Sequence, residues 1–377
     1  MARRPQSTPP VLPGYAYLRP LGAGGFADVF LYEQDMPRRV VAVKVLSTDA
    51  INLEARSQFV AEANAMARLS THPSILTIYE ASISADGRPY LATEFCPESF
   101  GDRYKQAPLA VGVVLDAGVR MAGALETAHR GGVLHRDIKP SNILVTTLGQ
   151  PVLSDFGIAT ALNPYADETR LVAMSVPWSS PEVVAESTTG SVAAEVWSLG
   201  ATLYTLLAGR TPFAESTREK NTRELMKARV LRARYTAIGR PDVPPRVERL
   251  LERTMSREPS LRPASMLELG EELRAIQSEL GMPVTPLEVA GQQWGPVVSA
   301  FSEGGPEAQG PVLSTVQPES RRAVRAERAL RERARVGAEG LEPGSARGRR
   351  GLLLGGGIAL VVVVIGVVGL LLSGVFG

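Results

Sequence analysis

A short polar run near the middle of the chain carries residue types that could transfer a phosphoryl group. It extends from His135 to Asn142, and Asp155 follows after twelve further residues. At these spacings Asp137 can accept a hydroxyl proton, and Lys139 can neutralise charge on the moving phosphoryl group. The amide oxygen of Asn142 and the carboxylate of Asp155 suit Mg²⁺. The run therefore predicts metal-assisted phosphoryl transfer.

A glycine-rich turn nearer the N-terminus could bind phosphate oxygens. It runs from Leu21 to Val29 through Gly22 and Gly24, between two strand-like stretches. Bare backbone there lets N–H groups approach phosphate oxygens closely. A Rossmann dinucleotide site would need a third glycine and a following helix, and a Walker P-loop would need a Gly-Lys pair. The sequence has neither pattern here.

An isolated lysine follows this turn in a valine-rich stretch. Ala42 and Lys44 alternate with valines, so they share one face of a predicted strand. The chain contains five lysines against 36 arginines, which indicates that a compact point charge is needed at Lys44. Glu62 lies in a predicted helix over residues 58–69, where its carboxylate could hold Lys44.

The elements that must position these residues fall into two groups. Up to Phe95 the pattern alternates with a period of two, which indicates a half-exposed sheet. Beyond it, apolar residues recur at helical spacing over residues 114–128, and residues 198–208 are apolar on nearly every face, as in a buried helix. A final helix opens with Ser265 and Glu268 in capping-box spacing and ends near residue 281. We therefore expect an α+β domain that ends there.

Together these motifs resemble those of the eukaryotic-type (Hanks-type) serine/threonine protein kinases, especially the membrane-anchored bacterial ones. The resemblance covers residues 15–280 and rests on the two runs at 135–142 and 155–157. It implies a bilobal protein kinase-like fold, with a small antiparallel-sheet N-lobe carrying one helix (15–95) and a larger, mainly α C-lobe (98–281). It also implies ATP as phosphoryl donor, Mg²⁺ or alternatively Mn²⁺ as cofactor, and protein Ser/Thr hydroxyls as acceptors.

The resemblance also assigns roles to individual positions. Lys44 and Glu62 are similar to the ion pair of the active state, and residues 93–96 resemble the gatekeeper and hinge. It implies catalytic roles for Asp137, Lys139 and Asn142, and metal binding by Asn142 and Asp155. The residues implied to bind ATP are Leu21, Gly22, Gly24, Val29, Ala42, Lys44, Glu62, Glu94 and Cys96.

Residues 155–182 resemble an activation segment. Arg262 matches the arginine that pairs with Glu182 at its end, and Arg136 could bind the segment once it is phosphorylated. Thr169 is a candidate phosphate acceptor, with an unmodified loop residue as the alternative. Ser175 stands where the family has threonine and should supply the hydroxyl that contacts the base.

Three positions depart from the family pattern. Glu195 replaces the aspartate that anchors the catalytic loop, so one extra methylene must be accommodated. Met174-Ser175 replaces Gly-Thr, and Pro97 replaces a glycine after the hinge. These changes leave open a pseudokinase or ATP-binding scaffold, and the shared fold leaves open transfer to a small molecule. We expect His135 to be structural, and His72 and His129 to be core or surface residues.

Composition excludes several other classes of protein. The 41 basic and 39 acidic residues give a net charge of +2, which argues against nucleic acid as the partner. One cysteine and three histidines argue against a disulfide framework and a zinc site.

The C-terminal part differs from the rest. Residues 351–372 are uncharged and long enough for a membrane-spanning helix, for which a buried core helix is the alternative. We expect a disordered N-terminus (1–14), a Pro/Gly/Arg-rich juxtamembrane linker (282–350), a transmembrane helix (351–373) and a short outer tail (374–377). Residues 321–350 contain ten arginines and four glutamates, so this basic segment could contact anionic lipid, with a solvated charged linker as the alternative.

These features predict a single-pass protein of the cell membrane. The positive charge before the span places the kinase domain in the cytoplasm. A homodimer for trans-autophosphorylation is a further expectation.

Overall fold

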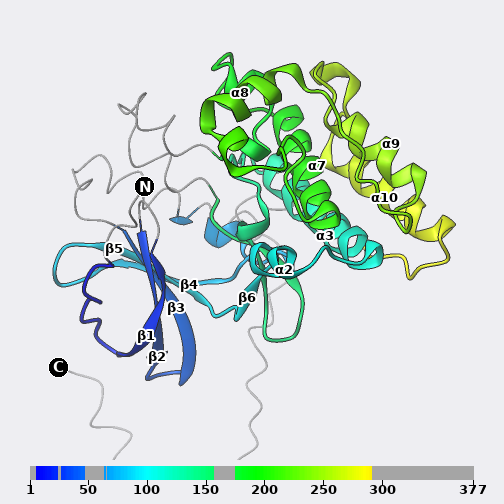
Figure 1. Ribbon diagram of the computed structural model, residues 1–377. Helices are drawn as coiled ribbons and strands as arrows, with labels where there is room; N and C mark the ends of the chain where they lie inside the picture. The colour runs from blue at the N-terminus through cyan, green and yellow to red at the C-terminus, as the bar shows by residue number, and fades with distance from the viewer. Residues whose placement is uncertain (1–5, 24–26, 47–62, 65, 157–174, 291–377) are drawn as a thin grey trace, which may run out of the picture. The chain divides into compact units, whose positions relative to one another are not determined.

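The computed structural model of the protein describes residues 6–23, 27–46, 63–64, 66–156 and 175–290. Within this part the chain forms an antiparallel sheet followed by a mainly helical lobe (Figure 1). The predicted α+β architecture is therefore confirmed for the described residues. The predicted transmembrane helix lies outside them, and no helix among the described residues is long and apolar enough to cross a membrane.

The N-terminal sheet has five strands in the order β1-β2-β3-β5-β4. On β3, Val41, Val43 and Val45 are almost fully buried, whereas Ala42 and Lys44 lie on the opposite, half-buried face. This alternation is the period-two pattern expected from the sequence, and it turns Lys44 away from the core of the sheet. The strands are β1 (Tyr15–Ala23), β2 (Ala27–Gln34), β3 (Arg39–Leu46), β4 (Ile78–Ile83) and β5 (Pro89–Glu94).

The C-terminal lobe is built around α7 (Val192–Ala208). Trp197, Tyr204 and Leu206 on this helix are fully buried, as its nearly uniform apolar sequence predicts. The other α-helices are α2 (Phe100–Gln106), α3 (Val111–Arg130), α6 (Pro181–Val184), α8 (Arg223–Arg232), α9 (Pro245–Thr254) and α10 (Met266–Glu279).

A small three-stranded sheet, β6-β7-β8, carries the polar runs. Because β7 and β8 pair antiparallel, the residues before β7 and those after β8 lie at the same end of this sheet. The strands are β6 (Glu98–Ser99), β7 (Ile143–Val145) and β8 (Pro151–Leu153), and the 3₁₀ turns are η2 (Pro140–Asn142), η3 (Val176–Trp178), η4 (Arg218–Asn221) and η5 (Pro259–Leu261).

The described N-terminal residues 6–14 do not match the predicted disorder. Leu12 is buried in the core of the sheet, and Tyr32 donates a hydrogen bond to the Pro10 carbonyl at 2.7 Å. Ser7 donates through both its main-chain N–H and its hydroxyl to Asp28. The segment therefore belongs to the sheet lobe.

The chain also continues past the boundary expected at residue 281. Residues 282–290, assigned to the linker by the sequence analysis, pack on α3 and α10, which lie side by side (Figure 1). The packed domain therefore reaches Ala290, at the end of the described chain.

Candidate active site

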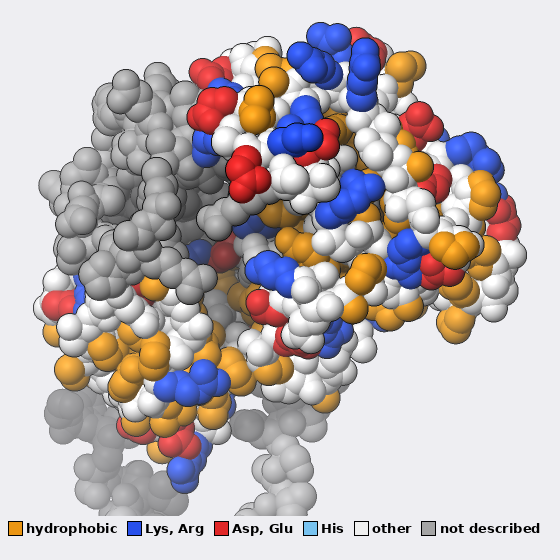
Figure 2. All heavy atoms as spheres, in the orientation of Figure 1, with side chains coloured by type: hydrophobic (Ala, Val, Ile, Leu, Met, Phe, Trp, Pro, Cys, Tyr) orange, Lys and Arg blue, Asp and Glu red, His pale blue; other side chains and the backbone are white. Residues whose placement is uncertain are grey.

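A cavity of about 410 Å³ lies between the N-terminal sheet and the helical lobe. Figure 2 shows the surface hollowed where the two lobes meet. Both apolar side chains and the charged side chains of Lys44 and Asp155 line the cavity. Every predicted ATP-binding residue that the structure describes lines it, namely Leu21, Gly22, Val29, Ala42, Lys44, Glu94 and Cys96.

Sequence reasoning missed most of the apolar lining. Five apolar residues also contribute to the cavity. Met66 comes from the helical residues 66–69 and Leu76 from the loop after them, whereas the strands β4, β5 and β7 supply Ile78, Leu91 and Leu144. The position of Leu144, two residues after Asn142, was the available indication for one of them. The other four residues lie in apolar patterns that any buried strand or helix would show, so the sequence does not mark them as cavity residues.

Lys44 and Asp155 form an ion pair across the cavity. The Lys44 Nζ to Asp155 Oδ1 distance is 2.5 Å, and the two side chains are 25% and 44% exposed. Asp155 has a φ of 62°, a left-handed conformation that is costly for a residue with a side chain. Burial acts to raise the pKa of Asp155, but Lys44 opposes it and the net pKa is lowered. The carboxylate is therefore held ionised beside the lysine.

Asp137 and Lys139 form an ion pair on the chain segment that precedes β7. Lys139 Nζ donates to Asp137 Oδ2 at 2.6 Å and to the Ser175 hydroxyl at 3.0 Å. Asn142 donates through Nδ2 to the Asp137 main-chain oxygen at 2.8 Å and to its Oδ2 at 3.2 Å. Ser175 was expected to contact the base, and its described contact is with Lys139. The lysine thus links the carboxylate to the segment at residue 175.

Two buried groups hold the loop that carries Asp137. His135 is fully buried, its Nε2 lies 2.8 Å from the Ser154 carbonyl, and its ring centroid is 4.6 Å from that of Phe156. Burial lowers the pKa of His135, which favours the neutral ring. Its expected structural role is therefore consistent with the geometry.

Glu195 anchors the same loop from α7. Its Oε1 accepts a hydrogen bond from the Arg136 main-chain N–H at 2.6 Å, and its Oε2 lies 2.6 Å from His129 Nε2. Arg136 has a φ of 67°, so this bond supports a strained backbone directly before Asp137. The extra methylene is accommodated, and sequence reasoning missed the pairing with His129.

The predicted pair between Glu182 and Arg262 is present. Arg262 donates to the two carboxylate oxygens at 2.7 and 2.9 Å, and its side chain is fully buried. Burial acts to raise the pKa of Glu182, whereas the hydrogen bond from Arg262 lowers it, and the net pKa is lowered. A third bond, from Arg262 to the Ala193 carbonyl, ties this pair to the start of α7.

Cys96, predicted to be a hinge residue, is half-buried. Burial, with a contribution from Glu94, raises the pKa of its thiol to about 12. The thiol is therefore protonated near neutral pH and is a poor nucleophile. Three other predicted site residues, Gly24, Glu62 and Thr169, lie outside the described residues, so the Lys44–Glu62 pair stays a prediction.

The donor set near Asp155 suits a magnesium ion held partly by a substrate. Asp155 supplies carboxylate oxygen and Asn142 an amide oxygen, which are hard ligands. No group of three His, Cys, Asp or Glu side chains able to hold a metal occurs in the described part of the chain. Mg²⁺ commonly takes one or two protein oxygens together with phosphate oxygens and water, and the residues present fit that pattern.

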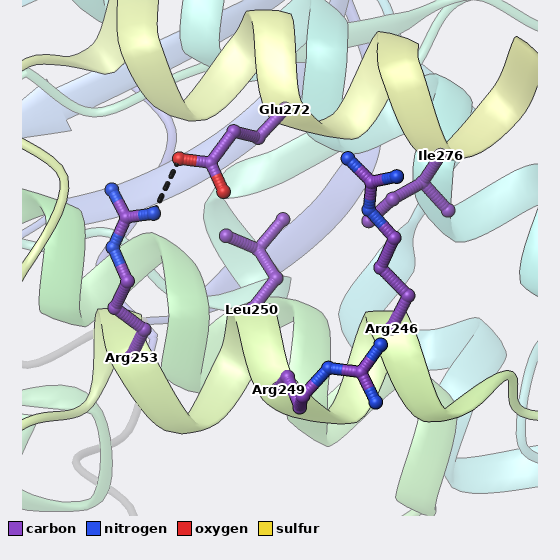
Figure 3. A pocket seen from close by; sticks show the side chains of 6 residues that line it. All are labelled: Arg246, Arg249, Leu250, Arg253, Glu272 and Ile276. Atoms are coloured by element: carbon purple, nitrogen blue, oxygen red, sulfur yellow. Dashed lines mark ion pairs between the residues drawn. The ribbon is translucent and has the colours of Figure 1, made fainter.

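A second cavity of about 310 Å³ lies between α9 and α10 (Figure 3). Leu250 and Ile276 lie among arginines there, and Arg253 pairs with Glu272 at 2.7 Å. Arg246 also pairs with a glutamate, Glu279. No predicted site residue lines this cavity.

Comparisons with known proteins agree with the site. The family model described as "Protein kinase domain" matches residues 15–272. The serine/threonine-protein kinase PknK of Mycobacterium tuberculosis (strain ATCC 25618 / H37Rv) is 37% identical over 273 residues, covering 72% of this chain and 24% of the relative.

Two further relatives extend this comparison. The serine/threonine-protein kinase PrkC of Bacillus subtilis (strain 168) is 32% identical over 249 residues, covering 65% of this chain and 38% of the relative. PknL of M. tuberculosis (strain ATCC 25618 / H37Rv), also named a serine/threonine-protein kinase, is 32% identical over 271 residues, covering 70% and 65%. The chain spans about a quarter of PknK and less than two thirds of the other two. With the family model matching more than half of its length, the chain belongs to the protein kinase domain family.

Proposed function

We propose that this protein is a serine/threonine protein kinase that transfers the γ-phosphoryl group of ATP to protein hydroxyls. The observation that carries the proposal is the position of Lys139, which contacts both Asp137 and Ser175. This arrangement places a carboxylate and an ammonium group at one point, next to a segment that could position an acceptor. The names of the relatives support the same acceptor class.

The cavity is suited to ATP along its whole length. Its apolar lining, which includes Ala42 and Leu144, can enclose an adenine ring, and the main chain at residues 94–96 can hydrogen-bond the edge of the ring. The Lys44 ammonium can bind phosphate oxygens. For this, Lys44 must exchange part of its contact with Asp155 for the nucleotide.

Asp155 and Asn142 are the residues that would hold Mg²⁺. When bound, the ion would neutralise phosphate charge and orient the phosphates. The lowered pKa of Asp155 keeps its carboxylate ionised for this purpose.

Asp137 would orient the acceptor hydroxyl and take its proton. The Asn142 side chain and the Glu195 contact hold the Asp137 loop from two sides, so the carboxylate is positioned before the acceptor arrives. Lys139 would stabilise negative charge on the phosphoryl group as it moves. Asp137 and Lys139, with the contacts that hold their loop, supply positioning and charge stabilisation.

We further propose that residues 351–373 anchor the kinase domain to the cell membrane on its cytoplasmic side, with residues 291–350 as the connecting segment. The support is the uncharged length of this stretch and the arginine-rich sequence before it. A membrane surface would raise the local concentration of the kinase and favour trans-autophosphorylation between two copies.

Nucleotide binding and phosphoryl transfer, measured separately, test the kinase proposal. Full-length wild type should bind ATP with Mg²⁺ and transfer radiolabel to a generic acceptor protein, and Asp137→Asn should bind with similar affinity but transfer at least about 100-fold more slowly. Binding without transfer by the wild type would favour the pseudokinase alternative instead. Labelled small-molecule product without labelled protein would favour a small-molecule kinase.

A further inference from the structure

Residues 282–290, here called the C-terminal strap, run along α10 and α3 of the helical lobe and contact the sheet lobe at His72. Met282 N–H bonds to the Gln277 carbonyl at 2.9 Å, so the chain turns back directly after α10. Thr285 is buried, and two of its polar groups donate hydrogen bonds. Its N–H donates to the Gln277 side chain at 2.9 Å, and its hydroxyl donates to Asp116 at 2.8 Å. These contacts fix the strap to α10 and α3.

Two glycines allow the strap to lie directly on the helices. A Cβ atom added to Gly123 on α3 would lie 2.2 Å from the Glu288 carbonyl oxygen, and one added to Gly270 on α10 would lie 2.8 Å from Leu287. At Gly270 the flexible Leu287 side chain could shift, but at Gly123 the contact is with backbone, so a side chain there would overlap with the strap. The strap therefore occupies a channel that only glycine keeps open at Gly123.

Near its end the strap contacts a buried histidine, before Ala290 N–H bonds to Thr127 on α3. His72 Nε2 lies 2.9 Å from the Glu288 carbonyl oxygen, and its Nδ1 accepts a hydrogen bond from the Ser74 main-chain N–H at 3.1 Å. Only the neutral ring with its proton on Nε2 can make both bonds. Burial lowers the pKa of His72, which agrees with that form.

The loop that holds His72 reaches the ATP cavity. This loop, residues 70–77, joins the helical residues 66–69 to β4. Leu76 donates to the Leu153 carbonyl, and Leu153 donates to the Ser74 carbonyl, both at 2.9 Å. Leu76 lines the cavity, and Leu153 stands two residues before Asp155. The position of His72 is thus connected to two walls of the nucleotide site by a short series of bonds.

We propose that the C-terminal strap is part of the catalytic unit and that His72 is its positioning residue for the nucleotide site. By bonding His72 through the Glu288 carbonyl, the strap sets the place of the 70–77 loop and with it the Leu76 wall of the cavity. This inference rests on the proposed kinase activity, because KM and kcat are measured through it. The contacts between the strap and the 70–77 loop do not depend on that activity.

Two substitutions of His72 separate its two bonds in the full-length protein. In His72→Asn the amide oxygen can still accept from Ser74, but the side chain is too short to reach Glu288. In His72→Gln the longer amide can still donate to Glu288. We expect the Asn variant to raise KM for ATP by about three- to tenfold with kcat nearly unchanged, and the Gln variant to restore KM to within about twofold of wild type.

Two glycine substitutions on α3 test the strap without touching His72. Gly123→Ala should push the strap off the helix and raise KM for ATP as His72→Asn does. Gly112→Ala is the matched control, because its Cβ would meet only Met282 Sδ at 3.6 Å, an ordinary contact. Hydrogen exchange should be faster at the amides of Ile75 and Leu76 in Gly123→Ala and unchanged in Gly112→Ala, with α7 as the internal reference for global unfolding.

Unchanged KM and unchanged exchange at residues 75–76 in both Gly123→Ala and His72→Asn would overturn the proposal. So would equal effects of Gly123→Ala and Gly112→Ala. If the wild type transfers no phosphoryl group, the proposed function fails, but the exchange comparison still decides whether the strap controls the loop.

Discussion

Glu195 meets two partners that come from different elements. One oxygen accepts from the Arg136 main chain and the other lies beside His129, and the carboxylate is nearly inaccessible to water. A buried carboxylate is costly unless its oxygens are bonded, so these two contacts explain why a longer acid is tolerated here. The same contacts place the backbone that carries Asp137.

Removing this carboxylate should reduce the rate of transfer more than the binding of ATP. In Glu195→Ala the Arg136 N–H loses its partner, so the catalytic loop relaxes while the cavity walls remain. We expect kcat to fall by about 10- to 100-fold with KM for ATP changed by less than about threefold. Steady-state kinetics check this, with Ser198→Ala on the same helix as the control. A larger effect on KM than on kcat would contradict the assigned role.

The buried pair of Glu182 and Arg262 should be important for stability. Glu182→Ala leaves the fully buried guanidinium of Arg262 without its carboxylate, which typically costs about 3–5 kcal/mol. Denaturant unfolding measures this loss. Glu271→Ala, which removes an exposed partner of Arg274, is the control and should change the free energy of unfolding by less than about 1 kcal/mol.

The same pair should give a pH dependence with a defined sign. The pKa of Glu182 is lowered in the folded protein, so its contribution is present above the ordinary glutamate pKa of 4.5 and is lost as the pH falls through the lowered value. The difference in melting temperature between wild type and Glu182→Gln should therefore be constant near neutral pH and shrink under acid conditions. A difference that grows on acidification would contradict the assignment.

At the scale of whole elements, the sequence predicted the strands and helices that have a periodic pattern of apolar residues. The alternation of Val41 and Val43 with Ala42 predicted β3, and the uniform apolar sequence predicted the buried α7, because burial of a face requires such repeats. The short polar runs predicted the catalytic loop for a related reason, since their chemistry constrains residue type and spacing together.

Two segments escaped prediction because contacts with residues far away in sequence hold them. The N-terminal segment is attached by Ser7 to Asp28, and the C-terminal strap is attached by Thr285 to Asp116. Neither segment repeats with a helical or strand period, and their partners lie far away in sequence. Proline-rich and glycine-rich composition then suggests disorder, although tertiary contacts decide otherwise.

The start of α10 offers a test of an element that the sequence did predict. The Glu268 N–H donates to the Ser265 hydroxyl at 3.0 Å, and the Glu268 carboxylate accepts from the Ala264 N–H at 2.8 Å. Ser265→Ala should lower the free energy of unfolding by about 1 kcal/mol. Urea denaturation should show no such loss for Ser260→Ala, whose hydroxyl is in an exposed turn. Equal midpoints for the two variants would rule out a capping role.

For the whole molecule, the near-neutral charge of +2 is an average over unlike parts. Figure 2 shows acidic and basic side chains interspersed over the visible face of the helical lobe. By contrast, residues 321–350 carry a charge excess of +6 from ten arginines and four glutamates, and residues 351–377 carry no charge. This uneven distribution motivates the proposed membrane anchor.

Cell fractionation tests the anchor. The full-length protein should sediment with membranes and require detergent for release, whereas deletion of residues 351–373 should move it to the supernatant. Replacing the ten arginines of 321–350 with glutamine is the control, and should leave the protein in the membrane pellet because one apolar helix suffices for insertion. Recovery of the full-length protein in a detergent-free supernatant would contradict the anchor.

The central claim is that Asp137 serves transfer from ATP to protein Ser/Thr hydroxyls. Its most direct test is mass spectrometry of a generic acceptor protein after incubation with ATP, Mg²⁺ and either the full-length wild type or Asp137→Asn. We predict phosphoserine or phosphothreonine on the acceptor with the wild type and at most about 1% of that amount with the variant. Phosphate on tyrosine alone, equal phosphorylation by both proteins, or none by the wild type would contradict the claim.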